Sequence, residues 1–250
     1  MRRLTKTASR RSATCALPDD ADKASFVKEM FDSLAPRYDL LNALMTFGLD
    51  TRWRSRAVTL LGLQPGSIVL DLASGTGDLA RELSRRAFVP VAADISLGML
   101  ARSKMALASL AADAALLPFT KGCFDGAVSG FALRNFADLA AVAGELGRVL
   151  RPGGRLSVLE VSEPEQPLVR AGHSIWFRHA VPLLGALLSD ANAYRYLPQS
   201  MAYLPSPKDL ASLLEAAGFG EVRRQVFTGG VVQIVTATRR GGQTYRARTS

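Results

Sequence analysis

The sequence predicts an α/β protein: a doubly wound, mostly parallel sheet of seven strands, preceded by N-terminal helices and carrying a late insert. From about residue 67, short apolar runs alternate with helical segments, which implies parallel strands joined by crossover helices. A glycine-rich turn follows the first apolar run. The last two runs are separated by little more than Gly229 and Gly230, which is typical of an antiparallel hairpin. We expect residues 23–238 to form one domain, a size that 250 residues can supply.

The segment before the sheet is predicted to be helical over residues 25–62. Apolar side chains recur there at helical spacing, Pro36 breaks the run, and the pattern resumes until Gly48. These helices are expected to come before the first strand.

The sheet elements follow in order. Strands are predicted over residues 67–72, 89–93, 107–112, 124–130 and 155–161, and helices over 78–86, 96–104 and 138–150. Ser96 is expected to cap the second of these helices. Residues 164–206 form a longer insert, partly apolar and aromatic, that suits a substrate cover. A helix over 207–217 and the hairpin strands 221–227 and 231–238 complete the chain.

The net charge of +9 lies in two short basic segments. Residues 1–12 hold five basic side chains and residues 239–250 hold four, with no acidic residue in either stretch. The rest of the chain carries 22 basic and 22 acidic side chains, so its surface gives no electrostatic reason to bind a polyanion. We expect residues 1–22 and 239–250 to be flexible basic tails and nucleic acid not to be a partner.

Two cysteines, Cys15 and Cys123, show no spacing typical of a disulfide framework or a zinc site. They indicate a reducing, cytoplasmic environment. No apolar run is long enough to span a bilayer. The basic, acid-free residues 1–17 fit either a short disordered tail or an organelle transit peptide.

The turn in segment 69–78 (VLDLASGTGD) predicts a nucleotide-type ligand site. Gly75 and Gly77 would let the backbone approach a ligand closely, although a tight turn without a ligand has the same pattern. Asp71 and Asp78 would repel a pyrophosphate, whereas a ligand with an amino group and a sulfonium would be favoured. S-adenosylmethionine therefore fits the turn better than NAD.

Further acidic residues follow the next two strands. Asp94, before Ile95, ends the second predicted strand, where a carboxylate can accept both ribose hydroxyls. Asp113 and Ala114 follow the third and are expected beside the adenine edge. Taken singly, each aspartate is more typical of a helix cap or a solvated loop. Their recurrence at successive strand ends favours a cofactor site.

These segments resemble the ubiquinone/menaquinone biosynthesis C-methyltransferases, which are class I S-adenosylmethionine-dependent enzymes. The resemblance covers about residues 23–237. It includes 31–42 (FDSLAPRYDLLN), 70–79 (LDLASGTGDL), 93–100 (ADISLGML), 117–119 (LPF), 131–136 (FALRNF), 148–156 (RVLRPGGRL), 194–198 (YRYLP) and 217–219 (AGF). The YDLLN, LRN and YRYL segments are far more particular to this family than the two glycine turns.

The resemblance implies a Rossmann-like fold and cofactor contacts at Thr76, Asp94, Asp113 and Ala114. Gly130 departs from the family pattern, because many relatives have alanine or a small polar residue there. Only its backbone is then expected to contact the cofactor.

The resemblance also implies methylation of a ring carbon on a prenylated hydroquinone, here demethylmenaquinol or a ubiquinone precursor. The ring carbon becomes nucleophilic when an adjacent phenol loses its proton. Arg134 is the first candidate to stabilise that phenolate, with a surface ion pair to Asp138 as the alternative reading. Asn135 is expected to orient the ring hydroxyl.

Several further side chains are secondary candidates. His179 could relay the proton, although a packed histidine in an apolar helix is more usual. Tyr194 is a further catalytic candidate, and Tyr38 and Tyr196 are expected to contact the ring, with plain packing as the alternative. Trp176 lies in an apolar stretch of the insert that is expected to receive the isoprenoid tail or to touch a membrane.

Other readings stay open on the sequence. One keeps the fold and acts on another aromatic or lipid substrate. A second is a protein that binds or modifies nucleic acid, against which the neutral body counts. The resemblance leaves the oligomeric state open, with a homodimer as one form. No metal is expected, and contact with a membrane surface would be weak and peripheral.

Overall fold

The computed structural model describes residues 20–103, 108–164 and 199–241, together with residues 166, 167, 170, 172 and 196. Three helices come first: α1 (Asp20–Leu34), α2 (Tyr38–Thr46) and α3 (Asp50–Leu60). They confirm the predicted N-terminal helical region and its break at Pro36. Phe47 and Gly48 adopt a left-handed backbone after α2, which turns the chain into α3.

The sheet is formed by β1 (Ile68–Leu72), β2 (Val89–Asp94), β3 (Ala108–Ala111), β4 (Phe124–Gly130), β5 (Leu150–Val161), β6 (Phe219–Phe227) and β7 (Val232–Arg239). Its order is β3-β2-β1-β4-β5-β7-β6. The first five strands pair in parallel, and β7 lies antiparallel between β5 and β6. The predicted seven-stranded, mostly parallel sheet with a closing hairpin is confirmed.

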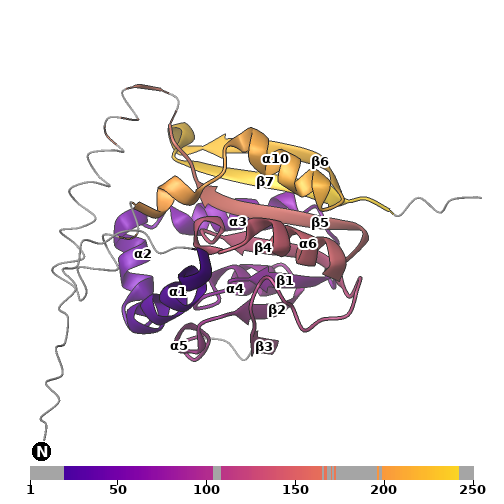
Figure 1. Ribbon diagram of the computed structural model, residues 1–250, viewed down its shortest axis with the longest axis horizontal. Coiled ribbons are helices and arrows are strands. Elements are labelled where there is room, and N and C mark those ends of the chain that lie inside the picture. Colours follow the sequence, from indigo (N-terminus) through magenta and orange to yellow (C-terminus); the bar gives the residue numbers. More distant parts are fainter. Residues whose placement is uncertain are drawn as a thin grey trace, which may run out of the picture.

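Helices cover both faces of this sheet (Figure 1). One face carries α3 and α4 (Asp78–Arg85), and the other carries α6 (Leu139–Val149) and α10 (Pro207–Ala216). The main core lies beneath α6 and α10, where side chains of both helices pack on β1, β4, β5 and β7. This three-layer arrangement leaves the carboxyl ends of the parallel strands at one edge.

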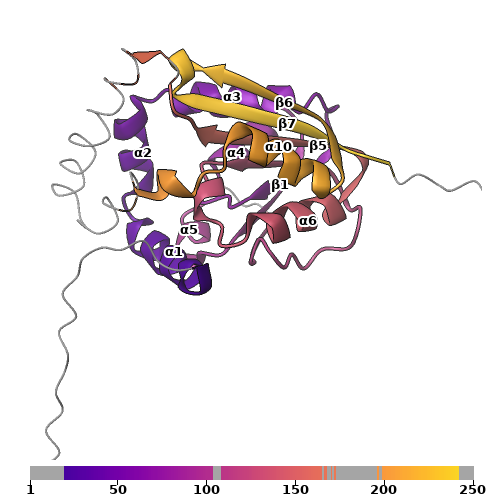
Figure 2. The same ribbon diagram turned by 45° about the horizontal axis from the view of Figure 1, so that its top comes forward.

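The first two helices lie at that edge. α1 contacts α5 (Leu97–Leu100), which follows β2, and η1 (Leu133–Asn135), which follows β4. In Figures 1 and 2, α1 and α2 occupy the same end of the molecule, away from the end of β7. A short helix, η3 (Ser200–Tyr203), also contacts η1. The segments after β2 and β4 are therefore covered by α1.

Some boundaries differ from those expected. The helix predicted over 96–104 ends at Leu100, although Ser96 caps it as expected by accepting a hydrogen bond from the Met99 amide. α1 begins at Asp20, inside the predicted N-terminal tail. β7 reaches Arg239, whose guanidinium donates to the carbonyls of Gly147 and Gly218. The predicted C-terminal tail thus begins two or three residues too early.

Candidate functional site

A turn with a left-handed backbone joins β1 to α4. Ala73, Gly75 and Gly77 have φ angles of 54°, 56° and 83°, and Gly77 is the N-cap of α4. Glycine adopts such angles at little cost, which explains the two glycines. The Gly75 amide donates to Asp94 Oδ2 at 2.8 Å, so the turn is fixed to the end of β2.

Asp94 is buried, and both of its oxygens accept backbone hydrogen bonds. Its Oδ1 accepts from the Ser96 amide at 2.8 Å, opposite the bond from Gly75. Burial raises the pKa of Asp94, and the two amides oppose that shift. A carboxylate oxygen has two acceptor sites, so each oxygen keeps one for a ligand. Asp94 can therefore still accept two hydroxyl donors, as its predicted role requires.

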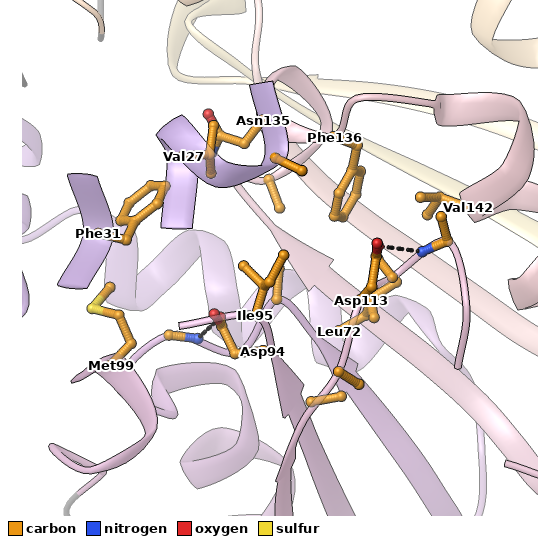
Figure 3. Close-up of a pocket in the computed structure, with 18 of the residues that line it drawn as sticks. Val27, Phe31, Leu72, Asp94, Ile95, Met99, Asp113, Asn135, Phe136 and Val142 are labelled. Carbon is orange, nitrogen blue, oxygen red and sulfur yellow. Dashed lines mark hydrogen bonds between the residues drawn. The ribbon is translucent and has the colours of Figure 1, made fainter. Parts of the chain in front are cut away.

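A cavity lies against Asp94 at the carboxyl edge of the sheet, and Figure 3 shows the side chains around it. It brings together eight residues predicted for the site: Tyr38, Gly75, Asp94, Ile95, Asp113, Ala114, Gly130 and Asn135. We call it the acidic cavity, because every charged side chain on its wall within the described ranges is a carboxylate, from Asp94, Asp113 or Asp138. Such a wall favours a cationic ligand.

Gly130 ends β4 on this wall. A Cβ atom there would lie 2.9 Å from Cδ1 of Leu79 in α4, so a side chain would require Leu79 to move. Because Gly130 has no side chain, Leu79 of α4 can pack closely against the end of β4. The Gly130 backbone still borders the acidic cavity.

Asp71 was predicted to contact the cofactor, but in the structure it is fully buried and is not among the residues that line the acidic cavity. Its Oδ2 accepts a hydrogen bond from the Ala80 amide at 2.8 Å, and its Oδ1 has no hydrogen-bond partner in the described structure. Desolvation raises the pKa of Asp71 to about 7. Asp71 therefore holds the first turn of α4 against β1.

Thr76, Gly77 and Asp78 also differ from expectation. The Thr76 hydroxyl donates to Asp39 Oδ1 at 2.7 Å, which ties α2 to the glycine turn, and neither Thr76 nor Gly77 borders the acidic cavity. Asp78 forms ion pairs with Arg81 and, at 3.4 Å, with Arg54. Its charge is therefore balanced, and the acidic character of the site comes from other aspartates.

A second cavity adjoins the first and is mostly apolar. Both are bordered by Phe31, Tyr38 and Phe131. The other residues on its wall are Leu34, Leu41, Asn42, Met45, Thr46, Trp53, Arg134, Val161, Met201, Val231 and Val232. Among the described residues, Arg134 supplies the one permanent charge on this wall. We call this space the apolar cavity.

Arg134 pairs with Glu160, and both side chains are buried. The expected alternative partner was wrong: Asp138 instead caps α6 by accepting from the Ala141 amide at 2.9 Å. Glu160 also accepts from the amides of Leu133 and Val161, each at 2.9 Å. Burial raises the pKa of Glu160, and Arg134 opposes that shift. Arg134 Nε has no hydrogen-bond partner in the described structure, so its N–H can donate to a ligand.

Asn135 lies on the wall of the acidic cavity and is held by Tyr196. The Tyr196 hydroxyl donates to Asn135 Oδ1 at 3.2 Å, and its ring packs on Phe26 with centroids 5.4 Å apart. Tyr196 is fully buried, and burial raises its pKa to about 12. The prediction that Tyr196 lines the ring pocket is not supported: it borders neither cavity and instead positions Asn135.

Tyr38 borders both cavities, as expected of a residue that contacts substrate. Desolvation raises the pKa of its phenol, while the guanidinium groups of Arg54 and Arg134 oppose that shift. The phenol therefore stays protonated near neutral pH and can donate a hydrogen bond into either cavity.

Sequence reasoning missed Glu160 and Arg54. Arg54 lies 3.3 Å from Asp50 and 5.7 Å from the centre of the Phe131 ring, and its Nη2 has no hydrogen-bond partner in the described structure. Glu160 had a visible signal, because a single carboxylate interrupts the apolar strand segment 156–161. Arg54 had none, because two other arginines, Arg52 and Arg56, lie in the same helical stretch and nothing in their spacing distinguishes it.

Asp32 of α1 was also missed and holds the N-terminal helices over the acidic cavity. Its Oδ1 accepts hydrogen bonds from the Ser96 hydroxyl and from the Gly98 amide at 2.9 Å, and its Oδ2 pairs with Lys28 at 2.8 Å. Hydrogen bonds from Lys28 and Ser96 lower the pKa of Asp32 to about 2. α1 is thereby joined to α5 beside the cavity.

Three predicted residues, His179, Tyr194 and Trp176, lie outside the described residues, so their roles stay predictions. The fit to the expected cofactor can be judged from the acidic cavity alone. Its carboxylates suit a sulfonium and an amino group, the free acceptor sites of Asp94 suit ribose hydroxyls, and its apolar members, such as Met99 and Val142, suit an adenine. The residues present fit S-adenosylmethionine.

Comparison with known proteins agrees with this fit. The model of the ubiE/COQ5 methyltransferase family matches residues 19–239. A demethylmenaquinone methyltransferase of Thermus thermophilus is 45% identical over 215 residues, which cover 82% of this chain and 97% of that protein. A ubiquinone/menaquinone biosynthesis C-methyltransferase UbiE of Syntrophotalea carbinolica is 40% identical over 224 residues, covering 85% and 93% of the two chains.

A solved structure shows the same fold. A methyltransferase from Thermotoga maritima, described as S-adenosylmethionine-dependent and a possible histamine N-methyltransferase, superposes with a TM-score of 0.62 at 19% identity. The match covers 86% of this chain and 100% of that one. The chain therefore belongs to the ubiE/COQ5 methyltransferase family, which confirms the S-adenosylmethionine-dependent methyltransferase expected from the sequence.

Proposed function

We propose that this enzyme methylates a ring carbon of demethylmenaquinol to give menaquinol. The observation that carries the proposal is the pair of adjoining cavities, one lined by carboxylates and one apolar with a single guanidinium. Phe31, Tyr38 and Phe131 border both, so a ligand in one can meet a ligand in the other. The names of the Thermus and Syntrophotalea relatives support a quinone substrate, and a ubiquinone precursor is the alternative ring.

The acidic cavity is assigned to the cofactor. Asp94 would hold ribose hydroxyls with its two free acceptor sites, and Asp113 and Ala114 would border the adenine. When bound, S-adenosylmethionine supplies an electrophilic methyl group on a sulfonium. The carboxylates of Asp94, Asp113 and Asp138 then balance positive charge at the site.

The apolar cavity is assigned to the prenylated ring. Its aliphatic and aromatic side chains, including Leu41, Met45 and Trp53, would accept the ring and the start of the isoprenoid tail. This wall excludes water from the reacting ring, which strengthens any charge interaction there.

Arg134 is assigned to stabilise the phenolate of the ring. Loss of the phenol proton makes the neighbouring ring carbon nucleophilic, and a nearby guanidinium lowers the free energy of the anion. Arg134 cannot accept that proton because a guanidinium is already protonated and stays so in proteins. Glu160 fixes the guanidinium through a buried pair, while Tyr38, which borders both cavities, and Asn135, on the wall of the acidic cavity, offer neutral hydrogen-bonding groups.

We also propose a cytoplasmic protein with weak peripheral contact to a membrane, because the substrate of this assignment is a lipid. None of the helices in the described ranges has the length and hydropathy needed to cross a bilayer. The insert around Trp176 stays a candidate contact. Equal partitioning of the parent protein and Trp176→Glu into liposomes would contradict membrane contact through Trp176.

The test incubates the full chain with labelled S-adenosylmethionine and reduced demethylmenaquinone. We expect label in the quinone from the parent protein, a loss of cofactor binding in Asp94→Ala, and retained cofactor binding with little turnover in Arg134→Ala. Absence of label in the quinone would defeat the substrate assignment. Full turnover by Arg134→Ala would contradict the proposal that Arg134 stabilises the phenolate. The family assignment would be unaffected.

A further inference from the structure

The outward side of α2 is apolar. Leu40, Ala43, Leu44 and Phe47 recur at positions i, i+3, i+4 and i+7, so they share one side of the helix and its end. All four are exposed, with exposed fractions of 53% for Leu40, 39% for Leu44 and 71% for Phe47. We call these four residues the outer face of α2.

In the stretch that contains this face, the exposed charged side chains are basic and the acidic side chains are turned inward. Across residues 36–52, all of which the structure describes, the exposed charged side chains are Arg37 and Arg52, and both are basic. The two acidic residues of the same stretch point inward: Asp39 accepts from Thr76, and buried Asp50 accepts from Asn42 at 2.9 Å. Within this stretch, the exposed charge is therefore positive.

The opposite side of the same helix borders the apolar cavity. Leu41, Asn42 and Met45 of α2 lie on its wall, together with Thr46 at the end of the helix. One helix of nine residues thus separates the apolar cavity from an exposed apolar surface. A lipid at this surface would therefore lie about 10 Å, one helix diameter, from the cavity.

We propose that the outer face of α2 docks on a bilayer with anionic headgroups and brings the apolar cavity next to its lipid substrate. The proposal rests on the function proposed above, since it takes the substrate to be a prenylated ring dissolved in the bilayer. Leucine and phenylalanine enter the headgroup boundary, while the flanking arginines attract anionic lipid. This division of side chains is typical of helices that lie on a membrane.

A protein partner suits this face less well. A stable protein interface buries about 800 Å² per partner, more than one side of a two-turn helix provides. Basic flanks also disfavour a second copy of the same face, because like charges would meet across a two-fold axis. The bilayer is therefore the occupant that both size and charge favour.

The test compares two double variants in co-sedimentation with vesicles of phosphatidylcholine and phosphatidylglycerol. Leu40→Gln/Leu44→Gln makes the outer face polar, and glutamine favours helix, so α2 should keep its structure. Ile68→Thr/Val89→Thr is the matched control: these two exposed side chains are paired neighbours at the starts of β1 and β2, and threonine favours strand. Vesicles of phosphatidylcholine alone test the contribution of charge.

We expect the α2 variant to bind anionic vesicles roughly tenfold more weakly than the parent, because two leucine side chains that would be partly buried in the bilayer are lost. The control should bind like the parent, and the parent should bind phosphatidylcholine vesicles more weakly. Equal binding by the parent and the α2 variant would overturn the proposal, as would an equal loss in the control. A dimer in sedimentation equilibrium that becomes monomeric in the α2 variant, with vesicle binding unchanged, would assign the face to self-association instead.

Turnover separates this proposal from the function on which it rests. With a long-chain substrate in vesicles, the α2 variant should be slower than the parent, and with a short-chain, water-soluble hydroquinone the two should be equal. A loss with the soluble substrate too would assign the face to the fold or the cavity and overturn docking. If the parent methylates neither substrate, the proposed function fails, and the vesicle-binding comparison still decides the docking.

Discussion

Arg134 and Glu160 are two residues whose roles can be separated by substitution. Arg134→Ala should lower kcat by about 10²–10³, because a positioned charge next to a developing anion is removed. The same change leaves Glu160 buried without its partner, which costs about 3–5 kcal/mol of folding free energy. The double variant Arg134→Met/Glu160→Gln removes both charges and should recover most of that stability. We expect its kcat to stay low and its affinity for S-adenosylmethionine to match the parent.

A pH profile distinguishes the electrostatic role from a structural one. If Arg134 stabilises the phenolate, the double variant should gain activity as pH rises toward the pKa of the free phenol, near ~10. A kcat that is low and independent of pH would indicate that the pair only supports the fold. Thermal unfolding of the same samples checks that each variant is folded at the assay temperature.

Asp71 should make stability depend on pH. Its pKa is about 7 in the folded chain against the ordinary value of 3.8 for an aspartate, so between pH 4 and 7 the unfolded chain loses a proton that the folded chain retains. The contribution of Asp71 to the free energy of unfolding therefore falls as pH rises through this window and levels off above pH 7. Asp71→Asn cannot ionise. Relative to the parent, it should gain up to about 4 kcal/mol between pH 4 and pH 8.

Urea unfolding of the parent and Asp71→Asn at pH 4.5 and pH 8 measures that difference. The comparison between the two proteins cancels the titration of other buried acids, such as Asp94 and Glu160. A stability difference that is the same at both pH values would show that Asp71 is ionised in the folded chain at neutral pH.

Residues at the ends of predicted strands could be placed from sequence, and their partners could not. Asp94, Asp113 and Gly130 border the acidic cavity as expected, because parallel strands deliver their carboxyl ends to one edge. The partner of Arg134 was wrong because Glu160 is 26 residues away in sequence and becomes adjacent only when β5 pairs with β4. Likewise, the charge of Asp78 is balanced by Arg54 from α3, a contact that no local pattern records.

At the scale of elements, Asp32 joins α1 to α5 beside the acidic cavity. Asp32→Ala removes acceptors for the Ser96 hydroxyl and the Gly98 amide, which should cost about 1–3 kcal/mol of stability. Because Val27 and Phe31 of α1 border the cavity, we also expect several-fold weaker binding of S-adenosylmethionine by calorimetry.

The lowered pKa of Asp32 fixes the sign of its pH dependence. Its stabilising contribution is present above pH 4 and is lost as pH falls toward 2, where the folded-state carboxylate becomes protonated. Lys28→Ala is the matched control, since it removes only the partly exposed ion pair and should cost less than ~1 kcal/mol. Cofactor affinity that drops equally in both variants would indicate that the ion pair, and not the contact to α5, holds α1.

Element types followed from sequence better than element lengths. The alternation of apolar runs identified all seven strands, most clearly β1, β4 and β7, whose side chains are largely buried. Helix α5 ended at Leu100, earlier than the periodicity suggested, and Asp32 of α1 contacts it at Gly98. The role of Tyr196 was also set by packing on α1, through Phe26, and not by its own neighbours in sequence.

At the scale of the whole molecule, the excess positive charge lies mainly in residues outside the described ranges, and the structure refines how far the sheet extends toward the C-terminus. Arg239 belongs to β7, and the Arg240 amide donates to the Gly218 carbonyl at 2.9 Å, so both belong to the fold. A truncation that spares them can remove residues 1–12 and 242–250, which carry seven basic side chains.

Such a truncation should weaken membrane attraction and leave catalysis intact. Each basic residue near an anionic surface contributes about 1 kcal/mol or less, and salt screens this attraction, so the loss of vesicle binding should be largest at low ionic strength. Turnover of a detergent-solubilised substrate should equal that of the full chain, because the described residues that line the two cavities, from Ala24 to Val232, are all retained. Co-sedimentation and turnover at two salt concentrations measure both effects. A salt-dependent mobility shift with nucleic acid that survives the truncation would instead place a polyanion-binding surface on residues 13–241. The basic residues of the stretch 36–52 would then be the first to substitute.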